Sequence, residues 1–255
     1  MSARAITAWF IDTDDPVGYL TSHPVNDVDG ARRLAAGIYG ERVLVPEFDT
    51  DLASAAEAED SHMYAGWYGD LGVVVCSLFA TQTPSTLTRS LTAIHQSAVT
   101  TLLVTDPDTS FGAFARWENG TVKRSFAAYP VDITEDEGLP YPFERPFWAG
   151  EYPLRYAPGA TPELMALPFH PQHLAEQANR EWLGFRFTRP LADTDNDPAR
   201  IPVTAFSIHP ADYVPGEEDR ERYRASGQPA PVAEEPASES EPPVKRRSIA
   251  SYFGF

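Results

Sequence analysis

The stretch "FGAFARWENGTVKRSFAAY", residues 111–129, predicts a β-hairpin and thereby places a sheet at the centre of the fold. Asn119 and Gly120 form the residue pair that most readily takes the two positive φ angles of a type I′ turn. Aromatic and other strand-favouring residues flank the pair on both sides, as in two adjacent antiparallel strands. The rest of the chain must then supply strands that extend this sheet and helices that cover it.

Short apolar runs bounded by turn-forming residues predict further strands on both sides of the hairpin. The clearest is "AITAWFI", residues 5–11, which ends at the turn-rich "DTDDP". A pair of strands is expected within residues 62–79, where a glycine-rich turn separates two apolar runs. The other expected strands are residues 100–104, 184–188 and 202–208.

Apolar residues that recur at spacings of three and four predict three helices. The first has a capping residue at Asn26 or Asp27 and ends at Gly40, because glycine terminates helices readily. The third starts at Pro171, since proline is favoured at the first helical position, and runs toward Gly184. The expected helices cover residues 28–39, 86–98 and 171–183.

These elements predict an α+β fold: a mixed β-sheet with flanking helices and a β-hairpin, in a single domain of residues 1–214. Residues 215–243 are expected to be a disordered acidic linker, because they contain almost no large apolar side chains. Within this linker, "GEEDRERYRAS" at residues 216–226 is compatible with a short solvated helix. Residues 244–255 are expected to be a C-terminal docking peptide.

The composition indicates a protein that needs no disulfide bonds. The chain has 255 residues, of which 42% are hydrophobic, which is enough for a proper core. Cys76 is the single cysteine, so a reducing compartment is expected. No run approaches the roughly 18 consecutive apolar residues of a transmembrane helix, and the N-terminus lacks the pattern of a signal peptide. We therefore expect a cytoplasmic protein without a transmembrane segment.

The net charge of −17 is concentrated in the predicted domain. Residues 1–214 contain 29 acidic and 14 basic side chains, a net charge of −15. Such a field repels phosphate backbones, so the acidic domain is not expected to bind nucleic acid directly.

Asp12, Asp14 and Asp15 follow the strand at residues 5–11, at the position where open α/β sheets bind ligands. Asp12 and Asp14 are separated by one residue, which is similar to the way haloacid-dehalogenase-like phosphotransferases hold a nucleophile and an acid around Mg²⁺. Pro16 departs from that pattern. The alternative role for these side chains is in a turn or a helix cap.

The segment "ADTDNDPAR", residues 192–200, carries aspartates at alternate positions, as a calcium-binding loop does. Pro198 stands where the sharp turn of such a loop needs glycine, and Thr204 stands where a glutamate ligand belongs. The segment is therefore expected to be a solvated acidic loop.

Three histidines are candidates for a metal site. His170 and His173 lie three residues apart at the start of a predicted helix, and His209 lies in a second His-Pro pair. Imidazoles are common zinc ligands, and Glu176 or Glu181 would serve as a fourth ligand or as a base. The alternative is that these histidines cap or pack the helix. Neither a nucleophile elbow nor a phosphate-binding glycine loop accompanies them.

Several segments together resemble a family of uncharacterised actinobacterial proteins that carry a domain of unknown function. They are the hairpin and the sequences "PYPFERPFWAGEYP" (residues 140–153), "LPFHPQHLAEQA" (residues 167–178) and "IPVTAFSIHP" (residues 201–210). The resemblance covers most of residues 1–210. It implies the extent of the domain and its source, but it brings no established activity and no functional residues.

The last residues, "VKRRSIASYFGF" (244–255), place large apolar side chains after a long polar stretch. Ile249, Tyr252 and Phe253 share one face of a helical turn, and Phe255 extends that apolar patch. The pattern resembles the peptide by which replication and repair proteins dock onto DNA sliding clamps, with Arg246 where that motif usually has glutamine. Folding back onto the acidic domain and contact with an anionic membrane are alternatives for the same segment.

The function expected from the sequence is that of an adaptor or regulatory protein, which needs no cofactor and recruits a protein partner through residues 244–255. In that function Arg246, Ile249, Tyr252, Phe253 and Phe255 contact the partner. The alternative function is a metal-dependent hydrolase. It would use Asp12, Asp14 and His170 as catalytic residues and His170, His173 and His209 as metal ligands.

Overall fold

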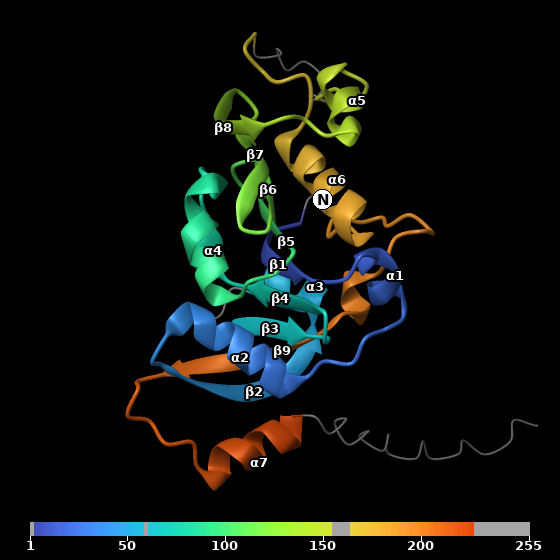
Figure 1. Cartoon of the computed structure of the whole chain (residues 1–255). Helices are drawn as coiled ribbons and strands as arrows, with labels where there is room; N and C mark the ends of the chain where they lie inside the picture. Colours follow the sequence, from blue (N-terminus) through green and yellow to red (C-terminus); the bar gives the residue numbers. More distant parts are fainter. Residues whose placement is uncertain (1–2, 59–60, 155–163, 227–255) are drawn as a thin grey trace, which may run out of the picture.

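One large β-sheet organises the molecule (Figure 1). The computed structural model describes residues 3–58, 61–154 and 164–226. Within these residues nine strands pair in the order β2-β9-β3-β4-β1-β5-β6-β7-β8. The strands are β1 (Ala5–Ile11), β2 (Val43–Asp51), β3 (Met63–Trp67), β4 (Leu71–Val75), β5 (Val99–Asp106), β6 (Phe111–Glu118), β7 (Thr121–Tyr129), β8 (Asp132–Gly138) and β9 (Pro202–His209).

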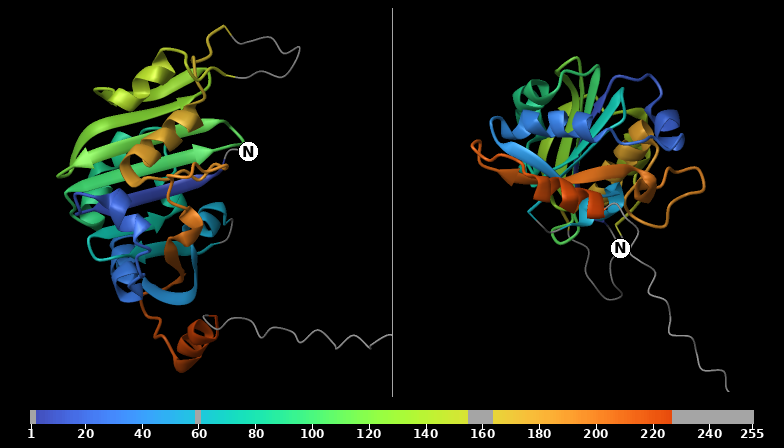
Figure 2. Two further views of the ribbon diagram at one scale, coloured as in Figure 1. Left: turned by 90° about the vertical axis from the view of Figure 1, so that its right-hand side faces the viewer. Right: turned by 90° about the horizontal axis from the view of Figure 1, so that it is seen from below.

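Helices cover both faces of this sheet (Figure 1, Figure 2). The helices are α1 (Pro16–Thr21), α2 (Val28–Tyr39), α3 (Leu52–Glu57), α4 (Thr88–Ile94), α5 (Arg145–Trp148), α6 (Pro171–Leu183) and α7 (Glu217–Ser226). Helices α1, α3 and α6 pack into the core on one face, whereas α2 and α4 pack into the core on the other. Four short 3₁₀ helices lie at Ser77–Phe79, Pro84–Leu87, Pro142–Glu144 and Pro198–Arg200.

Strand β1 runs through the middle of both cores. Trp9 and Ile11 belong to the core beneath α6, whereas Ala8 and Phe10 belong to the core beneath α2 and α4. A strand that is buried on both faces has no solvent side, so its sequence is continuously apolar and does not alternate. This burial explains why the run at residues 5–11 is uninterrupted.

The predicted fold class, α+β with flanking helices and a hairpin in a single domain, is confirmed. The sheet is antiparallel at each of its strand pairings rather than mixed. Short turns join β3 to β4, β5 to β6, β6 to β7 and β7 to β8, and strands joined in this way must pair antiparallel. The alternation of strands and helices early in the chain does not reveal the antiparallel pairing, because β1 and β2 are consecutive in the chain but are not neighbours in the sheet.

The hairpin forms as predicted. Asn119 has a φ of 49° and Gly120 a φ of 73°, which are the two positive values that a type I′ turn requires. Strand β6 then pairs with β7 from Gly112 opposite Ala128 to Glu118 opposite Thr121.

Two of the predicted helices have the expected ends. The Asp27 side chain caps α2 by accepting a hydrogen bond from the Asp29 N–H, whereas Asn26 bonds to Trp67 and Thr204 instead. Gly184 ends α6 in the left-handed conformation, with a φ of 78°.

The helix expected over residues 86–98 is shorter. Its first turn is the 3₁₀ helix Pro84–Leu87, and α4 ends at Ile94, so Ala98 lies outside it. The segment 184–188 was expected to be a strand, and this prediction is wrong. Phe185 and Phe187 are buried in the core beneath α6, and the Asn179 side chain binds the Phe185 carbonyl in place of a neighbouring strand.

The linker expected at residues 215–243 begins with a helix that packs on the domain. The Tyr223 hydroxyl in α7 donates to Asp49 at 3.0 Å, and the Ser226 hydroxyl donates to the Glu47 carbonyl at 3.0 Å. The described fold therefore extends to residue 226 rather than 214. Residues 227–243 and the docking peptide 244–255 lie outside the described residues. Among the helices in the described part of the chain, none is long and apolar enough to cross a membrane.

Candidate functional site

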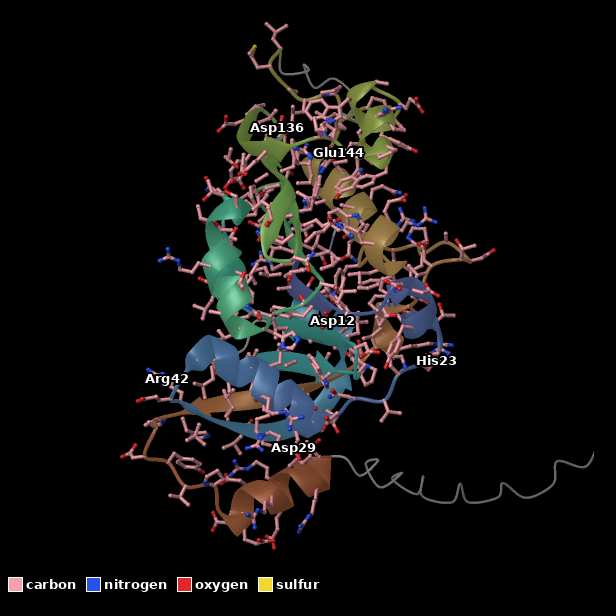
Figure 3. All side chains as sticks on the ribbon, in the orientation of Figure 1. Asp12, His23, Asp29, Arg42, Asp136 and Glu144 are labelled. Atoms are coloured by element: carbon pink, nitrogen blue, oxygen red, sulfur yellow. The ribbon has the colours of Figure 1, made fainter. Side chains whose placement is uncertain are left out.

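Asp12 and His170, two of the residues proposed for a hydrolase, lie at opposite ends of the strands in the middle of the sheet. Asp12 follows the end of β1 that is level with Glu118 in β6, and Figure 3 shows it beside the middle of the sheet. His170 precedes α6, whose first residue, Pro171, lies against Gly112 at the other end of β6. Six residues of strand separate Gly112 from Glu118, or about 20 Å. The described fold therefore does not bring Asp12 and His170 together.

Asp14 is exposed in the loop before α1, where the neighbouring Asp15 caps the helix. Asp12 accepts a hydrogen bond from the Ala98 N–H at 2.7 Å and lies 3.6 Å from His95 Nε2. Asp15 therefore caps a helix and Asp12 accepts a backbone N–H, which fits the turn or helix-cap alternative that the sequence left open.

The three histidines also separate. The rings of His170 and His173 stack with their centres 4.9 Å apart, whereas His209 stacks on Tyr213 at the end of β9. In residues 3–58, 61–154 and 164–226, no group of three His, Cys, Asp or Glu side chains could hold a metal ion. His170, His173 and His209 therefore do not form the alternative zinc site, because β9 ends far from the start of α6.

His173 and Glu176 instead line a different site, a cavity of about 330 Å³ that we call the α6 cavity. Its other charged lining residues are Arg180, from the same helix, and Arg186 and Arg189, from the segment that follows it. Phe147 in α5 and Tyr152 after it form an aromatic wall in which the ring centres lie 4.5 Å apart.

Asp195 holds two of these arginines in place. Its side chain is 2% exposed and accepts from Arg180 Nε at 2.6 Å and from Arg186 Nη2 at 3.4 Å. Burial alone would raise its pKa, but the Ala192 N–H and the two guanidinium groups hold the pKa of Asp195 below its ordinary value. Within the acidic loop predicted at residues 192–200, Asp193 is exposed as expected, whereas the Asp195 side chain is buried.

Glu176 and His173 have shifted acidities for related reasons. Glu176 is buried, which raises its pKa, although the backbone N–H and hydroxyl of Thr188 donate to it and oppose the shift. Desolvation, and then the positive charge on Arg186, lower the pKa of His173. The cavity therefore favours a neutral imidazole beside fixed positive charges.

The sequence pattern predicted roles for His173 and Glu176 but none for the arginines of this cavity. Arg180, Arg186 and Arg189 do not follow a common motif, since Arg180 is helical, Arg186 lies in the segment mistaken for a strand, and Arg189 follows that segment. The signal that was present is local: the sequence "FRFTRP" at residues 185–190 places two arginines after a buried helix in a strongly acidic chain.

Asp12 lines a second cavity, of about 400 Å³, near the end of β1 and the hairpin turn. His95 lies beside it, with its ring edge-on to Trp67 at 5.1 Å between centres and to Phe10 at 5.9 Å. These contacts hold the imidazole in place through packing. The pair of Asp12 and His95 was not foreseen, because His95 lies just past a helix that the sequence predicted to continue.

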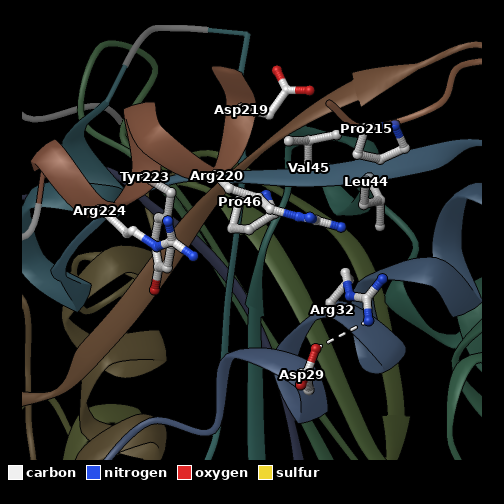
Figure 4. A pocket seen from close by; sticks show the side chains of 10 residues that line it. All are labelled: Asp29, Arg32, Leu44, Val45, Pro46, Pro215, Asp219, Arg220, Tyr223 and Arg224. Atoms are coloured by element: carbon white, nitrogen blue, oxygen red, sulfur yellow. Dashed lines mark hydrogen bonds and ion pairs between the residues drawn. The ribbon is translucent and has the colours of Figure 1, made fainter. Parts of the chain in front are cut away.

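A third cavity, of about 390 Å³, lies between α2, β2 and α7, and Figure 4 shows its lining. Leu44, Val45 and Pro46 of β2 contribute apolar surface. Its arginines are paired with exposed carboxylates: Arg32 with Asp29 at 3.0 Å, and two arginines of α7 with Glu217. This cavity exists only because α7 packs on the domain.

Comparison with known proteins identifies the domain. A family model described as "Family of unknown function (DUF6928)" matches residues 5–206. The chain belongs to this family. The DUF6928 match begins at the first residue of β1 and ends within β9, so it spans every strand of the sheet and leaves α7 and the residues after it outside. No curated protein and no solved structure matches the chain.

The DUF6928 match confirms the predicted membership of an uncharacterised domain family over most of residues 1–210. It names no activity, and an actinobacterial source stays a prediction.

Proposed function

We propose that this chain is an adaptor or regulatory protein of the cytoplasm that recruits a partner protein through residues 244–255. The observation that carries the proposal is the spacing of Ile249, Tyr252 and Phe253, which one helical turn presents on a single face. These side chains follow the polar, proline-rich sequence of residues 227–243, which offers them no apolar neighbours of their own. A complementary groove on a partner would bury them.

The position of helix α7 on the domain supports this proposal. Helix α7 is fastened to β2 through Tyr223 and Ser226, so the segment that follows starts from a defined point on the domain. The family match ends before α7, which separates this part of the chain from the common domain. The proposed recruiting segment therefore lies outside the domain that the family shares.

The size of the apolar patch sets the affinity to expect. Burying three such side chains contributes about 4 to 9 kcal/mol before the costs of ordering and association are subtracted. A single contact of this kind binds with micromolar affinity at best. The segment therefore tethers its partner reversibly.

A DNA sliding clamp is the partner class that the peptide pattern suggests, because clamps receive an aliphatic residue followed by two aromatic residues in an apolar pocket. The acidic domain would repel DNA itself, so recruitment through a protein that encircles DNA suits its charge. Arg246 occupies the position where the clamp-binding pattern usually has glutamine.

An affinity purification from the source cells tests recruitment. The full chain is compared with a variant carrying Ile249→Ala, Tyr252→Ala and Phe253→Ala. A matched control removes three exposed apolar side chains from the domain, through Val25→Ala, Leu139→Ala and Val214→Ala. We expect at least one partner to be lost from the tail variant and retained by the control. Identical partner lists from all three proteins would refute the proposal.

Fluorescence anisotropy of a labelled 244–255 peptide tests the partner class directly. Titration with the purified sliding clamp of the same organism should give micromolar binding, which the three alanine substitutions abolish. No binding by the peptide, together with a different partner in the affinity purification, would reject the clamp and leave recruitment standing.

A further inference from the structure

The α6 cavity gathers fixed positive charge in a chain with an excess of negative charge. The chain has 20 lysines and arginines against 37 aspartates and glutamates. Three of those cations, Arg180, Arg186 and Arg189, line one cavity of about 330 Å³. These guanidinium groups present planar N–H donors around one cavity, a geometry that matches oxyanions.

The carboxylates that pair with these arginines do not line the cavity. Asp195 binds Arg180 and Arg186, and Asp197 binds Arg189 at 2.9 Å, but neither aspartate is among the lining residues. The one carboxylate that does line the cavity, Glu176, is engaged by the N–H and hydroxyl of Thr188. The surrounding aspartates therefore hold the guanidinium groups in place. The guanidinium groups line the cavity, whereas these aspartates do not.

The arginines keep hydrogen-bonding capacity that the described residues do not use. A guanidinium group has five N–H donors in a fixed plane. Arg186 bonds Asp195 through Nη2 only, and its Nε is buried without a hydrogen-bond partner among the described residues. Arg189 bonds Asp197 through Nη2 only. The Nη donors of Arg186 and Arg189 that the aspartates leave free are available to an oxyanion in the cavity.

Part of the cavity lining is apolar. The rings of Phe147 and Tyr152 lie with their centres 4.5 Å apart, and Pro190 also lines the cavity. A volume near the low end of the range of ligand pockets, about 300 to 1,000 Å³, suits a small molecule. A lining that combines guanidinium groups with aromatic rings suits a molecule with an anionic head and a flat apolar body.

We propose that the α6 cavity binds a small oxyanion, a phosphate or carboxylate group, whose apolar body lies against Phe147 and Tyr152. Arg186 and Arg189 donate to the oxyanion, and Arg180 is a positioning residue that Asp195 holds beside them. This site is independent of the C-terminal peptide, so failure of either proposal leaves the other intact.

Titration calorimetry of the full chain tests the site with four probes: phenyl phosphate, benzoate, inorganic phosphate and chloride. Phenyl phosphate or benzoate should bind, and chloride at the same ionic strength should not. Tighter binding of phenyl phosphate than of inorganic phosphate assigns the site to an ester with an aromatic body. Equal binding of the two assigns it to free phosphate. Failure of phenyl phosphate, benzoate and inorganic phosphate to bind at millimolar concentration would overturn the proposal.

Two variants test whether the probes bind in the α6 cavity. Arg189 is 59% exposed, so Arg189→Gln should fold and should weaken the tightest probe by about tenfold or more, the effect of losing one charged hydrogen bond. Arg186→Lys keeps the charge beside Asp195 but removes the planar pair of donors, and it should weaken the same probe by a similar factor.

Arg33→Gln is the matched control. Arg33 is 69% exposed, pairs with Asp27 at 3.6 Å and does not line the α6 cavity, so its removal changes the net charge equally. Its affinity should stay within about twofold of the original protein. Equal weakening by Arg33→Gln and Arg189→Gln would show that the probes respond to net charge alone, which would overturn the site.

Discussion

At the scale of single residues, the most demanding feature is the ion pair of Arg124 and Glu144, because both side chains are fully buried. Arg124 donates from Nε and Nη2 to the two oxygens of Glu144 at 2.9 and 2.8 Å. A third donor, Nη1, reaches Asp136, which lies beside Glu144 near β8 (Figure 3). Such a pair ties β7 to the 3₁₀ helix Pro142–Glu144.

Glu144→Gln should destabilise the fold by about 3 kcal/mol or more, because it leaves the buried guanidinium with only the partly exposed Asp136 as a charged partner. Urea denaturation followed by circular dichroism measures the loss. Glu118→Gln, which breaks the partly exposed pair with Arg116, should cost less than about 1 kcal/mol. Equal losses in the two variants would show that burial does not control the effect.

His170 should make stability depend on pH. Burial, and then the charge of His173, lower the pKa of His170 below its ordinary value of 6.5, and its Nδ1 is buried without a hydrogen-bond partner among the described residues. The unfolded chain therefore binds a proton more readily than the folded one. The stabilising contribution is complete above the ordinary pKa and is lost as the pH falls below 6.5 toward the lowered value.

His170→Asn removes this contribution, and asparagine suits the N-cap position that His170 occupies. Between about pH 7.5 and about pH 5.5, the free energy of unfolding should fall less in the variant than in the original protein. Chemical denaturation at the two pH values gives the comparison. The same fall in both proteins would contradict a lowered pKa at His170.

At the scale of elements, the β6–β7 hairpin depends on its turn. Gly120 has a φ of 73°, and a Cβ at this position would lie 3.3 Å from the Thr92 hydroxyl oxygen. Gly120→Ala should therefore destabilise the protein by about 1 to 2 kcal/mol, as measured by urea denaturation.

Gly216→Ala is the comparison for the turn. Gly216 has no positive φ, and a Cβ there would meet no atom closer than 3.9 Å. Its effect should stay within about 0.5 kcal/mol. If Gly120→Ala proved equally mild, the turn would not constrain the hairpin.

The elements that the sequence predicted well are those with their own local signals. The strand at residues 5–11, the Asn119-Gly120 turn and the helix between Pro171 and Gly184 each carry a continuous apolar run, a turn pair or a cap. The segment 184–188 looked like a strand because its phenylalanines alternate. Tertiary packing beneath α6 buries both rings although the segment does not pair with a neighbouring strand. The alternating pattern therefore occurs here in a segment that is not a strand.

At the scale of the whole molecule, the sheet ends in two strands that need protection from other chains. Helix α7 packs on β2 at one end (Figure 1). At the other end, β8 is mostly exposed and carries four carboxylates, those of Asp132, Glu135, Asp136 and Glu137. Charged side chains on an edge strand discourage pairing with a second sheet. The sequence of β8 did not suggest a strand because acidic residues disfavour strands.

Asp132→Thr with Glu137→Thr should therefore promote self-association, which size-exclusion chromatography with light scattering would detect as a dimer or larger species. Both side chains are exposed. A control with Asp14→Thr and Glu57→Thr removes two exposed charges away from the edge and should remain at the mass of the original protein. Association in both variants would assign the effect to net charge instead.

The sequence by itself determined the features that depend on neighbouring residues: the hairpin, the buried first strand, two of the three predicted helices, the acidic character of the domain and the apolar pattern of Ile249, Tyr252 and Phe253. Only the tertiary structure decided that the sheet is antiparallel and that Asp12 and His170 lie at opposite ends of its central strands. It also decided that Arg180, Arg186 and Arg189 meet in one cavity. The physical reason is the separation along the chain over which each kind of interaction acts. Turn and helix preferences act over a few residues, whereas a site forms where strand pairing and core packing bring distant segments together.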